Sequence, residues 1–282
     1  LVEEGDEVII PEPCYVSYEP ITTLTGGVPV HIQCTEENEF RVTPEQIKEA
    51  LTEKTKMLIL SYPNNPTGAV LRHEDLVGIA EVLKDTDVIV LSDEIYAELC
   101  YGDEEYESIA HIEGMYDRTI VVNGFSKSFS MTGWRLGYAM GPKPLIETMT
   151  KIHQSCIMCS PTTSQYAGIT ALTSCDEEIL KMKEEYDFRR KYCVRKLNEM
   201  GLHTFEPRGA FYVFPNITSS GMDSDTFCME LLKRKNVAIV PGTAFGESGE
   251  GFARISYAYS LSHLQTALGR IEDFLHEIKE EK

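Results

Sequence analysis

The sequence predicts an α/β fold in which a mostly parallel sheet is followed by a smaller α+β unit. Continuous apolar runs at 56–62, 87–93 and 119–125 are typical of strands buried in a parallel sheet. Residues 73–85, between the first two runs, have the apolar spacing of a helix. After about Ser174 the character of the chain changes, and helices and short strands follow in mixed order. The alternation of strands and helices in the first part predicts helices on both faces of the sheet.

Two more strands and one helix are expected ahead of these apolar runs. Residues 6–10 and 26–32 are short strand candidates. A helix over 43–51 is predicted by Thr43 as its N-cap and by Gln46, which completes a capping box three residues later. A proline at the first helical position supports the same start.

The second part begins with one long helix that ends at Gly201. The apolar face of this helix consists of Ile179, Met182, Tyr186, Cys193, Leu197 and Met200. The elements expected after it are strands at 209–215, 237–242 and 252–258, a helix at 224–235 and a final helix from about Ser262. We place the domain boundary inside the long helix, which predicts a large domain over 1–185 and a small C-terminal domain over 186–282.

The charge of the chain excludes some classes of partner. Its 282 residues carry a formal net charge of -19, and such an excess of acid repels nucleic acid and anionic lipid. No apolar stretch is long enough to span a bilayer. The sequence therefore predicts neither nucleic acid nor membrane as a partner, and any anion must be held by a local group of positive charges.

The cysteines and histidines indicate neither a disulfide framework nor a metal site. The eight cysteines are irregularly spaced, and Cys156 and Cys159 form a single CxxC pair with no second pair. The seven histidines are scattered, so no metal is expected. Reduced, mostly buried thiols are typical of a cytoplasmic protein.

Polar residues follow several predicted strands where each strand ends. Asn64 and Asn65 follow the first apolar run, Asp93 and Tyr96 the second, and Lys127 the third. Each also has a structural explanation, because Asn-Pro favours turns, aspartate caps helices and tyrosine packs in cores. Open α/β sheets bind ligands at this edge, so together these residues predict a ligand site.

The chemistry of these residues points to pyridoxal phosphate. In a water-poor cleft, the ammonium form of Lys127 is disfavoured, which gives a nucleophilic amine able to form an imine with an aldehyde. Asp93, which we expect two strands away, would keep a proton on a heteroaromatic nitrogen, so that the ring accepts electrons. Arg135 and Ser126 would bind a phosphate.

Five motifs in this order resemble the class I/II aminotransferases of pyridoxal-phosphate fold type I, in the aspartate and aromatic aminotransferase group. The motifs are SYPNNPTG, SDEIY, GFSKSFSMTGWRLGY, PRGAFYVFP and FARISYA. They extend over nearly the whole chain. The resemblance implies a mostly parallel large domain, a smaller α+β C-terminal domain, pyridoxal phosphate as the cofactor and a homodimer. It also implies transfer of an amino group between an L-amino acid and a 2-oxo acid.

The resemblance assigns roles around the cofactor ring. It implies that Lys127 forms the Schiff base and then moves the proton from the substrate Cα. Asp93 would pair with the ring nitrogen, and Asn65 and Tyr96 would hydrogen-bond the phenolic oxygen.

Further roles follow from the same resemblance. Arg135 with Ser126 would hold the phosphate, Arg254 would grip the substrate carboxylate through two hydrogen bonds, and Tyr15 would stack on the ring. Tyr212, by contrast, is expected to be a core aromatic.

The sequence departs from the family at its start, and alternatives follow from that. The family's N-terminal segment, which includes a helix N-terminus that binds the phosphate, is absent, so a truncated form with weakened cofactor binding is expected. A C–S β-lyase of the same fold, the ligand-sensing domain of a transcription regulator and a catalytically dead fragment are the alternatives. The amino donor stays open, and aspartate, an aromatic amino acid, alanine and a succinylated diamine all fit.

Overall fold

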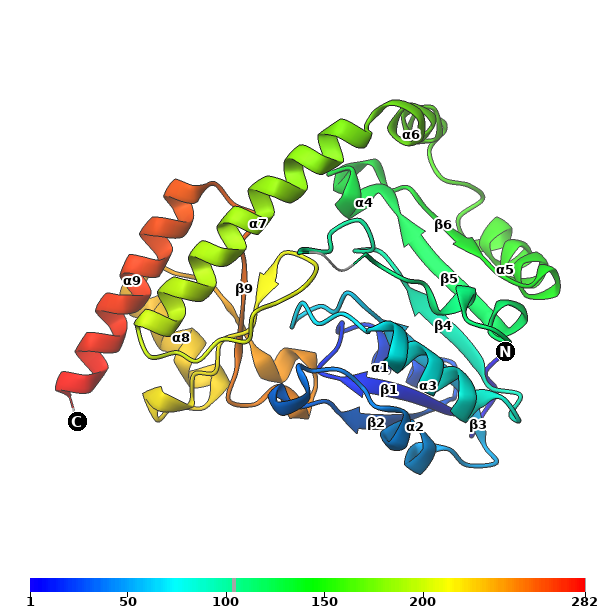
Figure 1. The fold of residues 1–282 in the computed structure, drawn as a ribbon, viewed down its shortest axis with the longest axis horizontal. Coiled ribbons are helices and arrows are strands. Elements are labelled where there is room, and N and C mark those ends of the chain that lie inside the picture. Colours follow the sequence, from blue (N-terminus) through cyan, green and yellow to red (C-terminus); the bar gives the residue numbers. More distant parts are fainter. Residues whose placement is uncertain (103–104, 282) are drawn as a thin grey trace.

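Two sheets organise the chain in a computed structural model that describes residues 1–102 and 105–281 (Figure 1). The larger sheet has six strands in the order β2-β1-β3-β4-β5-β6, and the smaller has three in the order β7-β9-β8. The strands of the larger sheet are β1 (Glu7–Glu12), β2 (Val28–Gln33), β3 (Thr55–Ser61), β4 (Ile89–Asp93), β5 (Thr119–Gly124) and β6 (Gly137–Met140). Those of the smaller are β7 (Tyr212–Val213), β8 (Val240–Pro241) and β9 (Ala253–Ser256).

The larger sheet is mostly parallel, as predicted. Strands β1 to β5 pair in parallel, and only β6 joins antiparallel, beside β5. In the register of the sheet, Asp93 lies opposite Ser61 of β3 on one side and opposite Val122 of β5 on the other. Strands β3, β4 and β5 therefore end at a common edge, and the segments that follow them meet there.

The helices cover the large sheet and build the C-terminal part. They are α1 (Tyr18–Leu24), α2 (Pro44–Ala50), α3 (His73–Leu83), α4 (Phe125–Ser128), α5 (Lys143–Cys156), α6 (Thr162–Ser174), α7 (Asp176–Glu199), α8 (Ser224–Lys235) and α9 (Leu261–Glu280). The predicted capping box at the start of α2 is confirmed, because Thr43 accepts from the Gln46 amide and the Gln46 side chain accepts from the Thr43 amide.

The larger core lies between the sheet and the helices α2 and α3. Ile47 of α2 and Ile79 of α3 pack with Leu58 and Val90, which belong to the central strands. Complete burial of such side chains contributes about 1.5–3 kcal/mol each relative to exposure. This packing holds β3 and β4 firmly, so the residues at their ends have a rigid support.

The C-terminal unit has its own core between the small sheet and the helices α7, α8 and α9. Leu197, Phe227 and Phe274 are fully buried there. Its strands are shorter than predicted, since β7 covers only two residues of 209–215 and β8 only two of 237–242. Pro215 and Pro241 bound these short strands, and proline has no N–H for a ladder hydrogen bond.

Helix α7 connects the two parts without interruption (Figure 1). It covers 24 residues, from the side of α6 to the C-terminal unit. The boundary predicted at residue 185 falls inside this helix, and the division into domains 1–185 and 186–282 stays a prediction.

The sequence prediction did not identify α1, α5, α6 or β6. None of the side chains of α5 is buried: Ile152 is exposed, and Leu145, Ile146 and Met149 are half-buried. The sequence of α5 is nevertheless amphipathic, so its apolar spacing was a signal that could have predicted this helix.

Across residues 1–102 and 105–281, no helix combines the length and the apolar character that a membrane crossing requires.

Candidate active site

The residues predicted at the strand ends come together at one edge of the large sheet. Asp93 is the last residue of β4, and Lys127 lies in the short helix α4 that directly follows β5. These strands are neighbours, so Asp93 lies one strand from the lysine rather than two as expected. The charge of Asp93 raises the pKa of Lys127, so the two side chains are close enough to interact electrostatically.

The turn after β3 directs Asn65 toward this space. The Oδ1 of Asn64 accepts from the backbone N–H of Thr67 at 3.2 Å and from its hydroxyl at 2.9 Å, so Asn64 stabilises the turn. Asn65 is left to accept a hydrogen bond at 2.8 Å from the Nη1 of Arg254, which belongs to strand β9. The two asparagines therefore have separate tasks.

A close approach at Gly68 joins the C-terminal unit to this turn. The carbonyl of Gly68 accepts backbone hydrogen bonds from Arg208 and Gly209, both at 2.9 Å. A Cβ at Gly68 would lie 2.3 Å from the Cβ of Pro207, and its φ of +74° also favours glycine. This contact brings the segment before β7 against the edge of the large sheet.

The amine of Lys127 lies among aromatic rings. Its Nζ is 5.9 Å from the ring centre of Tyr96 and 5.8 Å from that of Phe211. It makes no hydrogen bond or ion pair with any of the residues that the structure describes. Burial lowers the pKa of this amine, and the charges of Arg254 and Arg135 lower it further, while Asp93 opposes them. A neutral, nucleophilic amine is therefore more accessible here than at the surface.

Asp93 is held by a residue that the sequence analysis did not identify. The hydroxyl of Tyr18 lies 2.8 Å from the Oδ2 of Asp93 and 2.8 Å from the Oγ of Ser61. The other oxygen, Oδ1, accepts from the N–H of Ile95 at 3.2 Å. Burial raises the pKa of Asp93 above its ordinary value, and the hydrogen bonds and Lys127 pull it down in part. The hydrogen bonds fix the position of the Asp93 side chain, and its raised pKa makes the carboxylate a better proton acceptor than an exposed aspartate.

Arg254 approaches the same space from the C-terminal unit. Its guanidinium lies 4.5 Å from the ring centre of Tyr212 and 4.8 Å from that of Phe245, which belongs to a 3₁₀ turn at Gly242–Phe245. Its Nε is buried and has no hydrogen-bond partner among residues 1–102 and 105–281. A buried donor without an acceptor is costly, and a carboxylate ligand would supply the acceptor.

Tyr96 and Tyr212 form a buried pair of hydroxyls 2.9 Å apart. Burial raises the pKa of both phenols, so both are protonated at neutral pH. Tyr96 lies beside Lys127, as expected for a ligand of the cofactor. Tyr212 contacts Tyr96 and Arg254 at once, so the expectation that it only packs in the core was incomplete.

The predicted phosphate and stacking residues lie at the open side of this space. Arg135 is exposed, has a φ of +53° and donates to the carbonyl of Thr132 at 2.9 Å. Ser126 is half-buried and precedes Lys127 in α4. Tyr15 is 44% exposed, and its ring meets that of Tyr18 edge-on at 5.7 Å. Arg135 and Tyr15 are therefore more exposed than the other site residues, whereas Ser126 is half-buried like Lys127, Asp93 and Arg254.

The donor set fits pyridoxal phosphate. An amine without an acceptor suits an aldehyde, a carboxyl with a raised pKa suits a ring nitrogen, and an arginine with an unpartnered Nε suits a carboxylate. The residues that would hold the cofactor are Lys127, Asp93, Asn65, Tyr96, Tyr15, Ser126 and Arg135.

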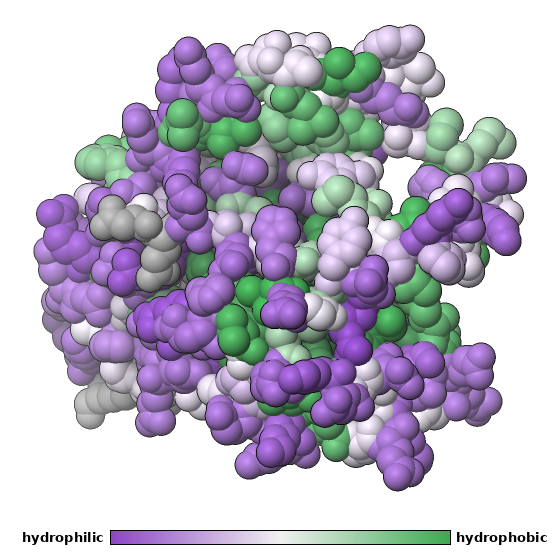
Figure 2. Space-filling view, turned by 45° about the vertical axis from the view of Figure 1, so that its right-hand side comes forward, coloured by the Kyte–Doolittle hydropathy of each residue, from purple (hydrophilic) through white to green (hydrophobic). Residues whose placement is uncertain are grey.

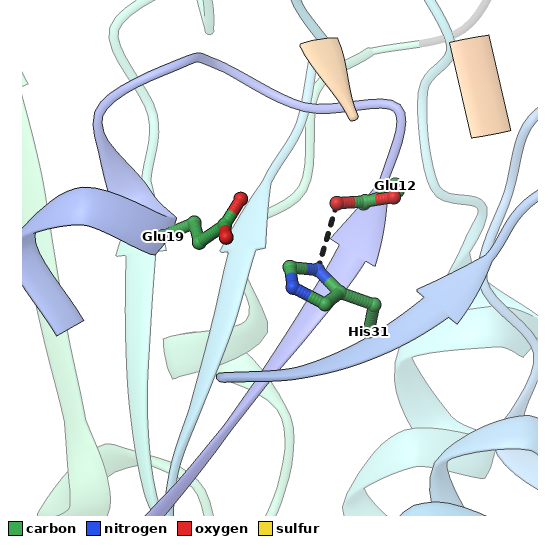
Figure 3. A group of neighbouring side chains, drawn as sticks. All are labelled: Glu12, Glu19 and His31. Atoms are coloured by element: carbon green, nitrogen blue, oxygen red, sulfur yellow. Dashed lines mark ion pairs between the residues drawn. The ribbon is translucent and has the colours of Figure 1, made fainter. Parts of the chain in front are cut away.

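A second group of titratable residues lies beside β1. The Nδ1 of His31 is 2.7 Å from the Oε1 of Glu12, and one ligand atom from each of Glu12, Glu19 and His31 lies within 4.8 Å of the others (Figure 3). Glu12 is buried, and burial raises its pKa while His31 lowers it. The ion pair accounts for Glu12 and His31, and Glu19 is exposed, so the group is explained without an ion.

The chain is similar to known aminotransferases over nearly its whole length. The family described as aminotransferase class I and II matches residues 1–271. The aspartate aminotransferase of Pyrococcus abyssi is 48% identical over 99% of this chain and 72% of the relative. For the aromatic-amino-acid aminotransferase 2 of Thermococcus litoralis the identity is 44%, over 99% of this chain and 72% of the relative. The crystal structure of an aromatic aminotransferase from Pyrococcus horikoshii superimposes with a TM-score of 0.97 at 47% identity, covering 99% of this chain and 75% of that one.

Proposed function

This chain belongs to the aminotransferase class I and II family, and we propose that Lys127, Asp93 and Arg254 carry its reaction. It is a pyridoxal-phosphate-dependent aminotransferase that acts on small molecules, an L-amino acid and a 2-oxo acid. The observation that supports these assignments best is the geometry of the strand ends. A carboxyl with a raised pKa ends β4, an amine with a lowered pKa lies directly after the neighbouring strand β5, and an arginine with an unpartnered Nε acts on that amine from β9.

Lys127 holds the cofactor and then acts as the base. When bound, pyridoxal phosphate supplies an electron-poor ring that stabilises negative charge at the substrate Cα. The Nζ of Lys127, once released, takes the proton from Cα, which requires a neutral amine near pH 7. Burial and the nearby arginines lower its pKa in that direction.

Asp93 maintains the charge that this chemistry needs. Its carboxylate would accept a hydrogen bond from the protonated ring nitrogen, and Tyr18 and the Ile95 amide hold this carboxylate in position. The raised pKa of Asp93 reflects a buried carboxyl without a full counter-charge, and a cationic ring nitrogen would provide that charge.

Arg254 orients the substrate. Two parallel hydrogen bonds from a guanidinium to a carboxylate fix both the position and the plane of the amino acid. Asn65 and the rings of Tyr212 and Phe245 keep the guanidinium in place before the substrate arrives.

We propose aspartate or an aromatic amino acid as the donor, following the printed activities of the relatives. The test uses this chain with pyridoxal phosphate, a panel of amino acids and 2-oxoglutarate, and it measures the 2-oxo acid and glutamate formed. We expect glutamate from at least one of these donors. Release of pyruvate and ammonia from a cysteine-type substrate without glutamate would indicate a lyase instead.

The assignment of Lys127 has a separate chemical test. After incubation with pyridoxal phosphate and borohydride reduction, peptide mass spectrometry should find the added cofactor on Lys127. The chain contains other lysines on exposed surfaces, such as Lys143, so labelling spread over those lysines alone would contradict the assignment.

We also propose that the chain forms a homodimer and that it is located in the cytoplasm. Apolar side chains are exposed on β6, α5 and α6, and Figure 2 shows hydrophobic residues on the upper part of the face at the height of α6. Exposed apolar surface of this kind is typical of a protein interface. The eight free cysteines fit a reducing compartment. Sedimentation of the chain would show a monomer if the dimer is wrong.

A further inference from the structure

Tyr212 contacts two parts of the site that have different tasks. Its hydroxyl lies 2.9 Å from that of Tyr96, and its ring lies 4.5 Å below the guanidinium of Arg254. It is 6% exposed, so both contacts are shielded from water. No other residue that the structure describes contacts both of these side chains in this way.

The two hydroxyls can share only one hydrogen bond, which leaves one proton free to point elsewhere. If Tyr212 donates to Tyr96, the proton of Tyr96 is free to point into the site. If Tyr96 donates, the free proton belongs to Tyr212. An acceptor that faces Tyr96, such as the phenolic oxygen of the cofactor, selects the first arrangement.

The charge of Arg254 strengthens this arrangement. A cation above a phenol ring favours the ionised phenol, and Arg254 lowers the pKa of Tyr212 against the effect of burial. Tyr212 is therefore a better hydrogen-bond donor when Arg254 carries an uncompensated charge. A substrate carboxylate on Arg254 compensates the charge and weakens the donor.

We propose that Tyr212 is a positioning residue that couples carboxylate binding at Arg254 to the hydrogen bond that Tyr96 donates into the site. The inference rests on the proposed roles of Arg254 and Tyr96. In the loaded chain, a weaker donor at Tyr96 would leave more negative charge on its acceptor and would thereby favour protonation at the Nζ of Lys127. Substrate binding thereby prepares the site for proton transfer.

Tyr212 interacts with charged and titratable groups from several elements. Tyr96 follows β4, Arg254 lies in β9, Tyr186 lies in α7, and the charge of Tyr15 acts on Tyr212 from the segment before α1. Arg254 also donates a hydrogen bond to Asn65, and its charge acts directly on the pKa of Tyr96. Variants at Asn65 and Tyr212 separate the two connections that run through side chains from this direct effect.

The first experiment needs no cofactor. Chain labelled with ¹³Cζ-tyrosine is titrated with maleate, a dicarboxylate without an amino group, and the resonance of Tyr96 is identified by its loss in Tyr96→Phe. We expect maleate to shift this resonance by a similar amount in the unsubstituted chain and in Asn65→Ala, and by a clearly smaller amount in Tyr212→Phe, where only the direct effect of the Arg254 charge on Tyr96 is left. An equal shift in Tyr212→Phe would overturn the inference, and so would a Tyr96 resonance that does not move although calorimetry detects maleate bound.

The second experiment uses the chain loaded with pyridoxal phosphate. Its absorbance is titrated against pH with and without maleate, which should raise the observed pKa. In Tyr212→Phe we expect this rise to be smaller by about 0.5–1 pKa unit, a change of about threefold to tenfold in proton affinity. The ring of phenylalanine retains the contact with Arg254, so maleate should still bind.

Tyr257→Phe is the matched control. Its side chain is also buried, and its hydroxyl donates to the carbonyl of Ala210 at 3.1 Å. Tyr257 directly follows β9, and within the described part of the chain no hydrogen bond or ring contact joins it to Arg254. It should behave as the unsubstituted chain does in both experiments. If maleate does not bind at all, the role of Arg254 is wrong and the inference fails with it. If maleate binds and only the coupling is absent, the proposed function stands and the inference alone fails.

Discussion

The edge of the large sheet and the strand β9 of the small sheet supply different kinds of chemistry. At the large sheet, Asp93 ends a strand of five residues, Lys127 follows a strand of six, and both have pKa values moved from their ordinary range. At the small sheet, Arg254 lies within a strand of four residues and is held by two rings and by Asn65. In the proposed reaction, the groups that exchange protons are thus held by the rigid sheet, and the cation proposed to orient the substrate comes from the other unit.

This difference follows from physical requirements. A group that must change its protonation state needs burial and neighbouring charges that persist through the reaction. Arginine keeps its charge at any physiological pH, so it needs only a fixed position. The comparison predicts that substitutions at the large sheet alter turnover and pH dependence, whereas those at Arg254 alter mainly substrate affinity.

Lys127→Ala should give the largest effect on activity. Loss of the base alone lowers the rate by about 10²–10⁴-fold, and loss of the attachment point for the cofactor adds to this. The measurement is the single-turnover rate with a saturating amino donor. A rate equal to that of the unsubstituted chain would contradict the proposed role of Lys127 as the base.

The same lysine should have the opposite effect on the stability of the cofactor-free chain. Because burial lowers the pKa of Lys127 from 10.5, the charged form is disfavoured in the folded state. That cost is fully present below the folded-state pKa and disappears as the pH rises through it toward 10.5. Lys127→Met should therefore raise the free energy of unfolding at pH 7, and the gain should shrink at higher pH. Denaturant unfolding measures both.

Asp93→Asn should have the next largest effect on activity. A buried cation on the ring without its counter-charge costs about 3–5 kcal/mol, so we expect turnover to fall by about 100-fold or more. The measurement is kcat with saturating cofactor and donor. An unchanged kcat would show that the carboxylate is not needed.

Stability provides the control for Asp93→Asn. The folded-state pKa of Asp93 is raised, so its contribution to stability is lost as the pH rises from the ordinary range of a carboxyl through the raised value. Asparagine does not titrate. The cofactor-free variant should therefore be at least as stable as the unsubstituted chain at pH 7. Any gain in its free energy of unfolding should disappear in acid, where Asp93 of the unsubstituted chain is protonated.

Arg254→Lys should lower kcat/KM by about tenfold to 100-fold, because one of two charge-assisted hydrogen bonds is lost. The loss should appear mainly in KM for the amino donor. Arg270→Lys is the matched control, since Arg270 is exposed on α9 and its hydrogen bond to the Asn236 carbonyl is 3.4 Å long. A change that appeared only in kcat would place Arg254 with the proton-transfer groups instead.

Tyr18→Phe should give the smallest effect, a fall in kcat of about threefold to tenfold for one lost hydrogen bond. The bond from Tyr18 lowers the pKa of Asp93, so the variant should also shift the acid side of the pH profile upward. Tyr166→Phe, at an exposed position of α6, should change neither quantity. A lower rate without a shifted profile would mean that Tyr18 has only a packing role.

The sequence predicted those features that repeat along the chain. The apolar runs indicated the parallel strands, and residues directly after them, such as Asp93 and Lys127, were placed correctly at the strand ends. Neither Tyr18 nor Tyr212 was recognised as part of the site, because each acts through a partner far away in sequence. Tyr18 reaches Asp93 across 75 positions, and Tyr212 reaches Tyr96 across 116. No local pattern encodes such a contact.

The order of the strands within the sheet was the other feature that could not be predicted from the sequence. A run of apolar residues predicts a strand but not which strand lies beside it, so the distance from Asp93 to Lys127 was expected to be two strands and is one. The exposure of Arg135 could not be predicted either, because it depends on how the segment after α4 leaves the sheet.

The hydrogen bond between Asn65 and Arg254 matters for cotranslational folding, because these two residues are 189 positions apart in the sequence. At about 5–20 residues per second, the ribosome releases Asn65 roughly 10–40 seconds before Arg254. During that interval the nascent chain can assemble its parallel sheet but lacks the arginine that we propose binds the substrate carboxylate. With that role for Arg254, a chain that terminates before β9 would keep the strand ends with Asp93 and Lys127 but would not bind an amino acid.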